Sequence, residues 1–138
     1  MRAVFDVNVL VRACLGSSPI NALLERCALG ESLLLTNELL VDEFAATTRK
    51  PRLLTKIDLD TYDDILALLA TSGEEIGVNP PFPACRDEDD RYLLGMAQPG
   101  GADYLVSLDQ DLLSPGTVGN CRIVTPGEVG SILGLQHE

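Results

Sequence analysis

The sequence predicts an α/β fold in which helices cover both faces of a parallel sheet. Short apolar runs of strand length alternate along the chain with longer segments that have helical periodicity. The runs consist mainly of consecutive apolar residues, which is typical of strands buried on both faces of a parallel sheet. The 138 residues, 46% of them hydrophobic, are enough to form one core. We therefore expect residues 1–138 to form a single domain.

Turn and cap residues divide the first half of the chain into elements. Pro19 suits the first turn of a helix, and Gly30 ends that helix. Thr36 or Asn37 can cap the next helix, which Pro51 interrupts. In order, these signals predict a strand over 2–5, helices over 9–15 and 19–29, a strand over 32–35 and a helix over 38–49.

The second half of the chain continues this alternation. Asp58 or Asp60 can begin a helix that ends near Ala70, and Asp87 can cap a helix that ends before Pro99. These signals predict a helix that begins at Asp58 or Asp60 and ends near Ala70. After it they predict, in order, a weak strand over 75–78, a helix over 88–98, a strand over 104–107, a short helix over 109–113, a strand over 122–124 and a helix over 126–133.

The charge of the chain is unusual for a protein that binds nucleic acid. Its 21 acidic residues outnumber 10 Lys and Arg, so the net charge is −11. This charge argues against simple attraction to a phosphate backbone, because nucleic-acid binders usually present a positive surface. Four acids are consecutive over residues 87–90. The balance favours a cationic partner, either a metal ion or a basic protein segment.

Cysteine use and hydropathy indicate a cellular compartment. The longest apolar run covers residues 65–70 and predicts neither a membrane span nor a signal peptide. The four cysteines contain no C-x-x-C pair, and one histidine cannot complete a zinc finger. Because a core of this size needs no disulfide, we expect reduced thiols and a cytoplasmic protein that does not bind membranes.

Four acidic residues are predicted to meet at one edge of the sheet. Asp6 ends the first strand, Glu43 lies in the helix after the second, Asp90 in the helix after the third, and Asp109 follows the fourth. In an open parallel sheet the functional crevice lies beyond the carboxyl ends of the strands. Asp6, Asp90 and Asp109, each taken alone, are also typical of a helix cap or first turn. Their convergence on one edge favours a site.

Helical periodicity places two of these acids on apolar faces. Glu43 shares a face with Leu39 and Leu40, whereas Glu38 and Asp42 fall on the other side. Asp90 likewise shares a face with three apolar residues, which are Leu93, Leu94 and Ala97. A carboxylate on an apolar face is costly unless a cation or hydrogen-bond donors meet it.

Converged carboxylates with no histidine or cysteine among them select hard cations such as Mg²⁺ or Mn²⁺. Without a cation, their mutual repulsion would raise their pKa values. Two such ions about 3.5–4 Å apart can polarise a phosphodiester and activate a water molecule. Bound dications would also make an acidic site attractive to a phosphate.

Four segments resemble the motifs of PIN-domain ribonucleases. Residues 4–11 (VFDVNVLV) resemble the opening D-x-N-x-L/V signature, and residues 39–44 (LLVDEF) the helix that carries the internal glutamate. Residues 86–90 (RDEDD) resemble the third motif, and residues 101–113 the fourth. Among these ribonucleases, the sequence is most similar to the VapC-like toxins of bacterial toxin–antitoxin pairs. Leu108 stands where relatives often have glycine.

The resemblance implies a three-layer α/β/α sandwich with a mostly parallel sheet of about five strands. It implies a metal-dependent endoribonuclease, a homodimer, and inhibition by a cognate antitoxin protein. Asp6, Glu43, Asp90 and Asp109 match the catalytic and metal-binding acids of the family. The accessory positions are matched by Asn8 and Ser107, which would orient metal or water, and by the acids Asp87 and Asp111.

One basic cluster stands out in this acidic chain. It contains four of the ten basic residues, Arg49, Lys50, Arg52 and Lys56. The cluster is consistent with a solvated helix end, and equally with contacts to RNA or to a partner protein. Arg12 lies one helical turn after Asn8 and could also face substrate.

The resulting hypothesis is a hydrolase that cleaves RNA phosphodiester bonds with a metal-activated water, using two Mg²⁺ or Mn²⁺ ions when substrate is bound. The main alternative is a PIN module that binds or processes RNA on its own, with or without catalysis. A phospho-acceptor signalling domain has a similar layout of acids. Receiver domains, however, carry a lysine on their last strand, and the last lysine here is Lys56.

Overall fold

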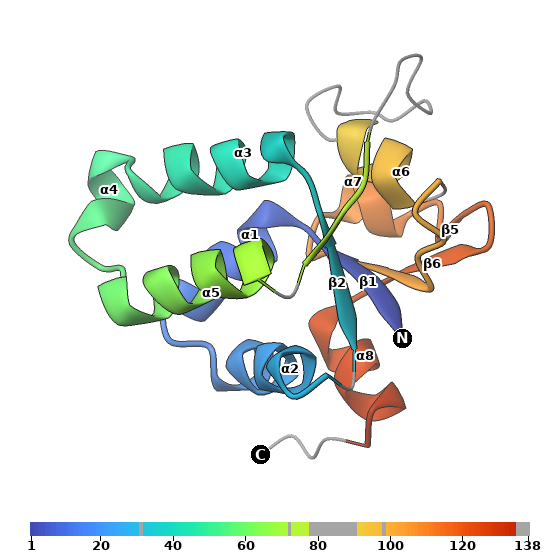
Figure 1. The fold of residues 1–138 in the computed structure, drawn as a ribbon, viewed down its shortest axis with the longest axis horizontal. Helices are drawn as coiled ribbons and strands as arrows, with labels where there is room; N and C mark the ends of the chain where they lie inside the picture. Colours follow the sequence, from blue (N-terminus) through green and yellow to red (C-terminus); the bar gives the residue numbers. More distant parts are fainter. Residues whose placement is uncertain (31, 72, 78–90, 98, 135–138) are drawn as a thin grey trace.

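The computed structural model describes residues 1–30, 32–71, 73–77, 91–97 and 99–134. Within these residues, strands form one sheet in the order β3-β2-β1-β4-β6-β5 (Figure 1). The strands are β1 (Arg2–Phe5), β2 (Leu33–Thr36), β3 (Glu74–Glu75), β4 (Tyr104–Val106), β5 (Thr117–Val118) and β6 (Cys121–Val124). Neighbouring strands run parallel except β5, which pairs with β6 in the antiparallel sense.

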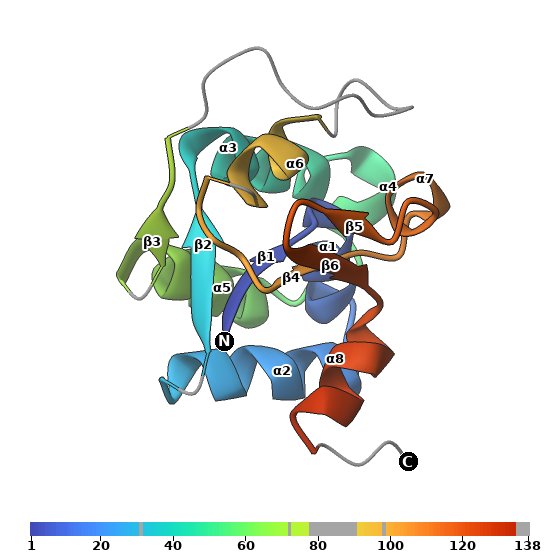
Figure 2. The same ribbon diagram turned by 90° about the vertical axis from the view of Figure 1, so that its right-hand side faces the viewer.

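Helices lie on both faces of this sheet. The first four are α1 (Val7–Cys14), α2 (Ser18–Ala28), α3 (Glu38–Thr48) and α4 (Pro51–Leu54). The others are α5 (Leu59–Thr71), α6 (Arg91–Ala97), α7 (Gln110–Leu113) and α8 (Pro126–Ile132). Figures 1 and 2 show α1, α3 and α5 on one side of the sheet and α6 on the other. The predicted three-layer α/β/α sandwich with a mostly parallel sheet is confirmed.

The centre of the core is β1 with its two neighbours. Ala3 and Val4 are fully buried, and so are Leu35 of β2 and Leu105 of β4. Strands buried on both faces need consecutive apolar residues, which is why these runs were recognisable in the sequence. Because these strands pair in parallel, their carboxyl ends lie together at one edge of the sheet.

The structure differs from the predicted elements in four places. The weak strand predicted over 75–78 is instead the two-residue strand β3 at Glu74–Glu75, and residues 76 and 77 belong to no strand. The first helix begins at Val7 rather than at residue 9, directly after Asp6. Pro51 starts a further short helix, α4, where proline suits the first helical position because it has no backbone N–H to leave unpaired. Thr117 and Val118 form an additional strand, β5, which was not predicted and pairs with β6 in a tight hairpin.

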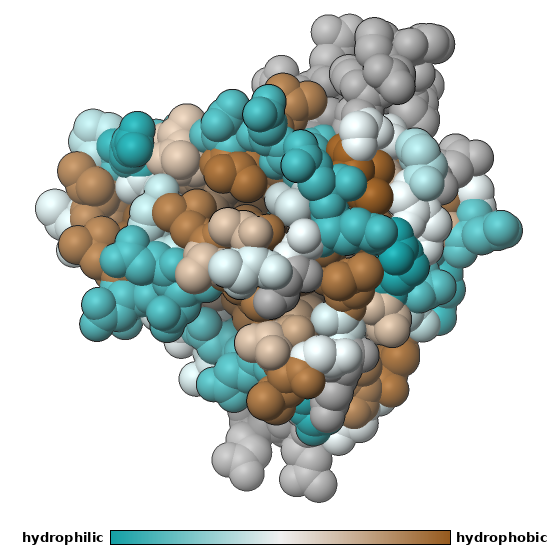
Figure 3. Space-filling view, viewed as in Figure 1, coloured by the Kyte–Doolittle hydropathy of each residue, from teal (hydrophilic) through white to brown (hydrophobic). Residues whose placement is uncertain are grey.

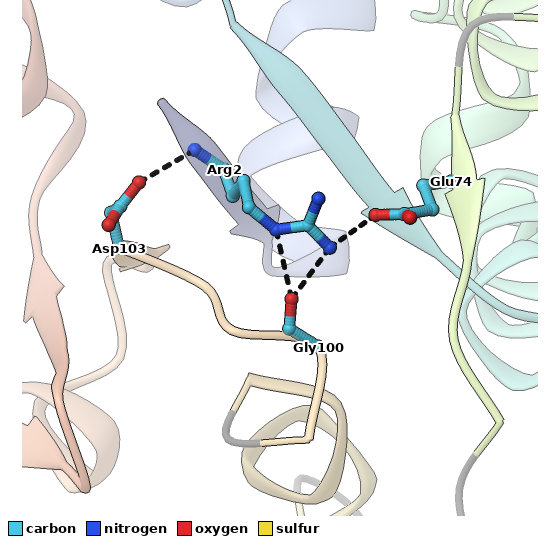
Figure 4. Close-up of polar contacts among 4 residues, drawn as sticks. All are labelled: Arg2, Glu74, Gly100 and Asp103. Carbon is cyan, nitrogen blue, oxygen red and sulfur yellow. Dashed lines mark hydrogen bonds and ion pairs between the residues drawn. The ribbon is translucent and has the colours of Figure 1, made fainter.

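Arg2 joins three parts of the sheet at the amino end of β1 (Figure 4). Its guanidinium forms an ion pair with Glu74 of β3 and donates to the carbonyl of Gly100 from Nε at 3.0 Å and Nη2 at 2.7 Å. Its backbone N–H donates to Asp103 Oδ2 at 2.9 Å. These contacts connect β1 with the edge strand and with the segment that leads into β4.

Three cysteines of the described residues, Cys14, Cys27 and Cys121, are buried free thiols. Burial is the main cause that raises the pKa of each to about 11. The fourth, Cys85, lies outside the described residues. At neutral pH these three thiols are protonated and behave as small apolar core residues.

The surface mixes polar and apolar residues (Figure 3). Apolar colour at the left edge of that view lies over α4 and the start of α5, where Leu54 and Leu59 are 53% and 63% exposed. No single described helix is long and apolar enough to cross a membrane. Helices α1 and α2 meet that length and composition only as a pair bent by 107°.

Candidate active site

Asp6 and Ser107 come together because β1 and β4 are parallel neighbours in register. Phe5 pairs with Val106, so the residue after each strand lies at the same edge of the sheet. The backbone continues this pairing, since Asp6 N–H donates to the Val106 carbonyl at 2.9 Å. Ser107 N–H in turn donates to the Val124 carbonyl of β6 at 2.9 Å.

The Ser107 hydroxyl joins two of the predicted site acids. It donates a hydrogen bond to Asp6 Oδ2 at 2.9 Å and accepts one from the backbone N–H of Asp109 at 3.0 Å. Ser107 is fully buried, so its hydroxyl has little freedom to move away. This one side chain therefore fixes the Asp6 carboxylate and the start of the segment that carries Asp109.

Asp6 is a carboxylate held in a poorly solvated position, with 3% of its surface exposed. Burial raises its pKa, and the negative charges of Glu43 and Asp109 raise it further. The Ser107 hydroxyl and, more weakly, the nearby backbone N–H of Asn8 act in the opposite direction without cancelling the rise. The three acids from β1, α3 and the β4–α7 segment thus share one electrostatic environment.

Glu43 is positioned by the packing of α3. The Asn37 side chain caps this helix by accepting from Leu40 N–H at 2.9 Å. Leu40 and Phe44 are buried, and the Phe44 ring lies 5.2 Å from the ring of Tyr62 on α5. Glu43 lies beside this buried face and is half-buried.

One part of the predicted helix face is wrong. Leu39 is 49% exposed, whereas helical periodicity predicts it on the buried face with Leu40 and Glu43. The buried side of α3 instead follows Leu40, Phe44 and Thr48, which are spaced by four residues. Glu43 therefore lies at the margin of the apolar face, half-buried, and its charge acts on Asp6.

Asp109 and Asp111 lie at the amino end of α7. Asp109 caps the helix, its Oδ1 accepting from the backbone N–H of Asp111 at 2.9 Å. Both residues are half-buried. The cap interaction uses one carboxylate oxygen of Asp109, and Oδ2 accepts no hydrogen bond from the described residues. Capping and a role in the site are therefore compatible for this residue.

The site opens into a pocket of about 860 Å³ bordered by Asn8 and Asp109. Arg12 and Arg52 also line this pocket, and Arg49, Lys50 and Lys56 are exposed outside it. The sequence placed Arg12 near the site but did not join it to Arg52. Pro51 signals the start of the unpredicted helix α4, but no local signal gives the position of Arg52 relative to α1.

Two of the predicted acids, Asp87 and Asp90, lie outside the described residues. Three residues of the helix face predicted for Asp90 are described and buried, namely Leu93, Leu94 and Ala97. Within the described part of the chain, no group of three or more His, Cys, Asp or Glu residues is close enough to hold a metal ion. The structure thus brings Asp6, Ser107 and Asp109 together, with Glu43 acting on Asp6 electrostatically. The catalytic assignment of all these residues stays a prediction.

Comparison with known proteins gives a family for this arrangement. The model of the PIN domain matches residues 2–111, which include β1 to β4 and the start of α7. The search of curated proteins finds no match. PIN domains are generally nucleases and typically use divalent metal ions. Because the match covers most of the sequence, this chain belongs to the PIN-domain family.

Proposed function

We propose that this protein is a metal-dependent endoribonuclease that hydrolyses phosphodiester bonds of RNA. The observation that carries the proposal is Asp6, a buried carboxylate at the carboxyl end of the central strand, subject to the charges of Glu43 and Asp109. Burial of a carboxylate near two others is costly in the absence of a cation. A cation-dependent function gives this arrangement a physical reason.

The chemistry of the donors fits a hard dication. Every candidate side chain supplies oxygen, which Mg²⁺ and Mn²⁺ prefer. Mg²⁺ often binds through one or two carboxylates together with water and substrate phosphates. A closed group of three acids within the described residues is therefore not required. Asp6, Glu43, Asp109 and Asp90 are the residues proposed to hold the metal, with Asn8, Asp87 and Asp111 as accessory groups.

When bound, Mg²⁺ or Mn²⁺ would supply positive charge against the phosphate and make water more acidic. The protein's part is positioning. Ser107 holds the Asp6 carboxylate in one orientation, and the cap of α7 holds Asp109. In this proposal, Asp109 Oδ2 orients the attacking water and accepts its proton. The water oxygen bonds to phosphorus, one P–O ester bond breaks, and the departing oxygen takes up a proton.

The test of this proposal is cleavage of single-stranded RNA by the purified chain with Mg²⁺ or Mn²⁺. We expect cleavage that EDTA abolishes and that Asp6→Asn reduces by at least about a hundredfold. The matched control is Asp63→Asn, an exposed acid on α5 outside the site. Asp6→Asn protein that cuts at the parent rate would overturn the assignment. Purified parent protein that binds RNA without cutting it would favour the non-catalytic alternative.

We further propose a biological setting, the toxin of a bacterial toxin–antitoxin pair, acting in the cytoplasm as a homodimer. The resemblance of its four motifs to VapC-like toxins supports this proposal. Expression of the chain in bacteria should arrest growth, and co-expression of a small protein encoded immediately upstream should restore it. Light scattering of the purified chain tests the dimer. Growth that is unaffected by active enzyme would point to stand-alone RNA processing instead.

A further inference from the structure

The pocket beside the site acids contains two arginines that come from different helices. Arg12 lies on α1, one turn after Asn8, and Arg52 lies on α4. Asn8 and Asp109 border the same pocket, so the arginines and the site share one continuous space of about 860 Å³. Two positive side chains and one of the site acids, Asp109, thus line a single pocket.

Neither arginine has a protein partner within the described residues. Both are exposed, and neither side chain forms a hydrogen bond or ion pair there. Arg2 provides a contrast, because its guanidinium binds Glu74 and the Gly100 carbonyl. In a chain with 21 acids, two arginines that line one pocket and pair with no carboxylate of the described residues are available to an external anion.

We propose that this pocket binds the nucleotide next to the cleaved bond, with Arg12 and Arg52 on its phosphate. The inference rests on the proposed function and adds a second phosphate site to it. Asn8 and Arg12 are four residues apart, which corresponds to a rise of about 6 Å along α1. This rise is close to the spacing of successive phosphates in an extended strand. A strand with one phosphate at the site acids therefore places the next phosphate near Arg12.

The other wall of the pocket suits a sugar and base. Leu15 and Leu108 are 43% and 37% exposed there, and Leu53 is half-buried beside Arg52. Apolar side chains can pack against any base, and no aromatic side chain lines the described pocket. The pocket should therefore recognise a nucleotide by its phosphate and shape, with little preference among bases.

An acidic peptide is another anion that two arginines could bind. The position of the pocket favours RNA, because it is lined by Asp109, one of the residues proposed to hold the metal that acts on the reacting phosphate. A nucleic-acid strand bound at Asp6 and Asp109 must continue to either side, and this pocket is directly adjacent. A peptide would need no such continuity.

Binding is measured by fluorescence anisotropy with a labelled single-stranded RNA of mixed sequence. All chains carry Asp6→Asn, so that the strand is not cut. Adding Arg12→Gln or Arg52→Gln should weaken binding roughly tenfold and reduce the salt dependence by about 0.7 in the log–log slope. The matched control is Arg49→Gln, which removes an equal charge just before α4 but outside the pocket. It should change binding by less than about twofold.

A second measurement uses the chain with Asp6 intact. Arg12→Gln should raise KM about tenfold and leave kcat within roughly threefold, because Arg12 is proposed to bind the neighbouring phosphate and not the reacting one. An unchanged Tm in each arginine variant shows that the fold is intact, as expected for exposed side chains without partners. A loss of kcat at unchanged KM would overturn the subsite.

The outcomes separate this inference from the proposed function. If the parent chain cleaves RNA but the Arg12, Arg52 and Arg49 variants bind RNA equally well, the subsite is overturned. The nuclease proposal is unaffected by that result. RNA binding that depends on Arg12 and Arg52, in a parent chain that never cuts, supports the subsite and overturns the nuclease proposal. Binding of polyglutamate in place of RNA through these arginines overturns the subsite in favour of a peptide partner.

Discussion

At the scale of single residues, Asp6 is a carboxylate whose burial makes its charged form unfavourable in the folded protein. Its carboxylate is buried, and its pKa is raised mainly by that burial and then by Glu43 and Asp109. A folded-state pKa above the ordinary value of 3.8 means that the folded protein binds this proton more tightly than the unfolded chain. Protonated Asp6 therefore contributes its full stabilisation of the folded state at pH values below 3.8. It is lost as the pH rises through the raised pKa.

Asp6→Asn should therefore stabilise the metal-free protein at neutral pH. The amide removes a buried charge and can still accept from Ser107, so we expect a gain of about 0.5–2 kcal/mol in the free energy of unfolding. Urea denaturation in EDTA measures it, with Asp63→Asn as a control that should give no gain. The gain should shrink as the pH is lowered toward 3.8. A variant less stable than the parent at neutral pH would contradict this account of Asp6.

At the scale of elements, Arg2 holds β1 to the edge strand β3 and to the segment before β4. Its ion pair with Glu74 is solvent-accessible, since the two side chains are 37% and 44% exposed, and such pairs contribute little. The two hydrogen bonds to the Gly100 carbonyl are partly buried and come from a charged donor. We therefore assign most of the stabilisation to Gly100 rather than to Glu74.

Two substitutions separate these contributions. Arg2→Met should lower the free energy of unfolding by about 1–3 kcal/mol, and Glu74→Gln by less than about 1 kcal/mol. Both should leave RNA cleavage unchanged, because Arg2 lies at the amino end of β1 and the site at its carboxyl end. Thermal and urea denaturation provide the measurements, with the exposed Arg49→Met as control. Equal losses in the two variants would show that the ion pair is the main contact.

At the scale of the whole molecule, the sequence predicts the layers because the central strands are buried on both faces. The runs over 2–5, 32–35 and 104–107 lie within one residue of β1, β2 and β4. Strand β3 is harder to predict, since Glu74 and Glu75 are exposed at the sheet edge and lack an apolar pattern. Strand β5 has only two residues, and its pairing depends on a hairpin rather than on burial.

The candidate site was likewise predictable from the sequence only in part. Asp6, Ser107 and Asp109 could be placed together in advance, because parallel register brings the residues after β1 and β4 to one edge. The exposure of Leu39 could not be predicted in the same way. Periodicity alone does not decide whether a residue at the margin of a helix face is buried, because this depends on how α3 packs against α5. The meeting of Arg12 and Arg52 depends on the turn between α3 and α4, a tertiary feature that local patterns do not encode.

The net charge of −11 leads to a prediction for the whole fold. Acidic self-repulsion destabilises the folded state, and any salt relieves part of it by screening. A specific metal site adds stabilisation by mass action, about 2.7 kcal/mol when the free ion is a hundred times its Kd. Mn²⁺ should therefore raise Tm more than NaCl at equal ionic strength, and EDTA should reverse the difference. Asp6→Asn should retain the screening effect and lose the excess. If Mn²⁺ raised the Tm of Asp6→Asn above the NaCl value by as much as in the parent, the stabilising ion would lie elsewhere on the acidic surface, away from the carboxyl end of β1.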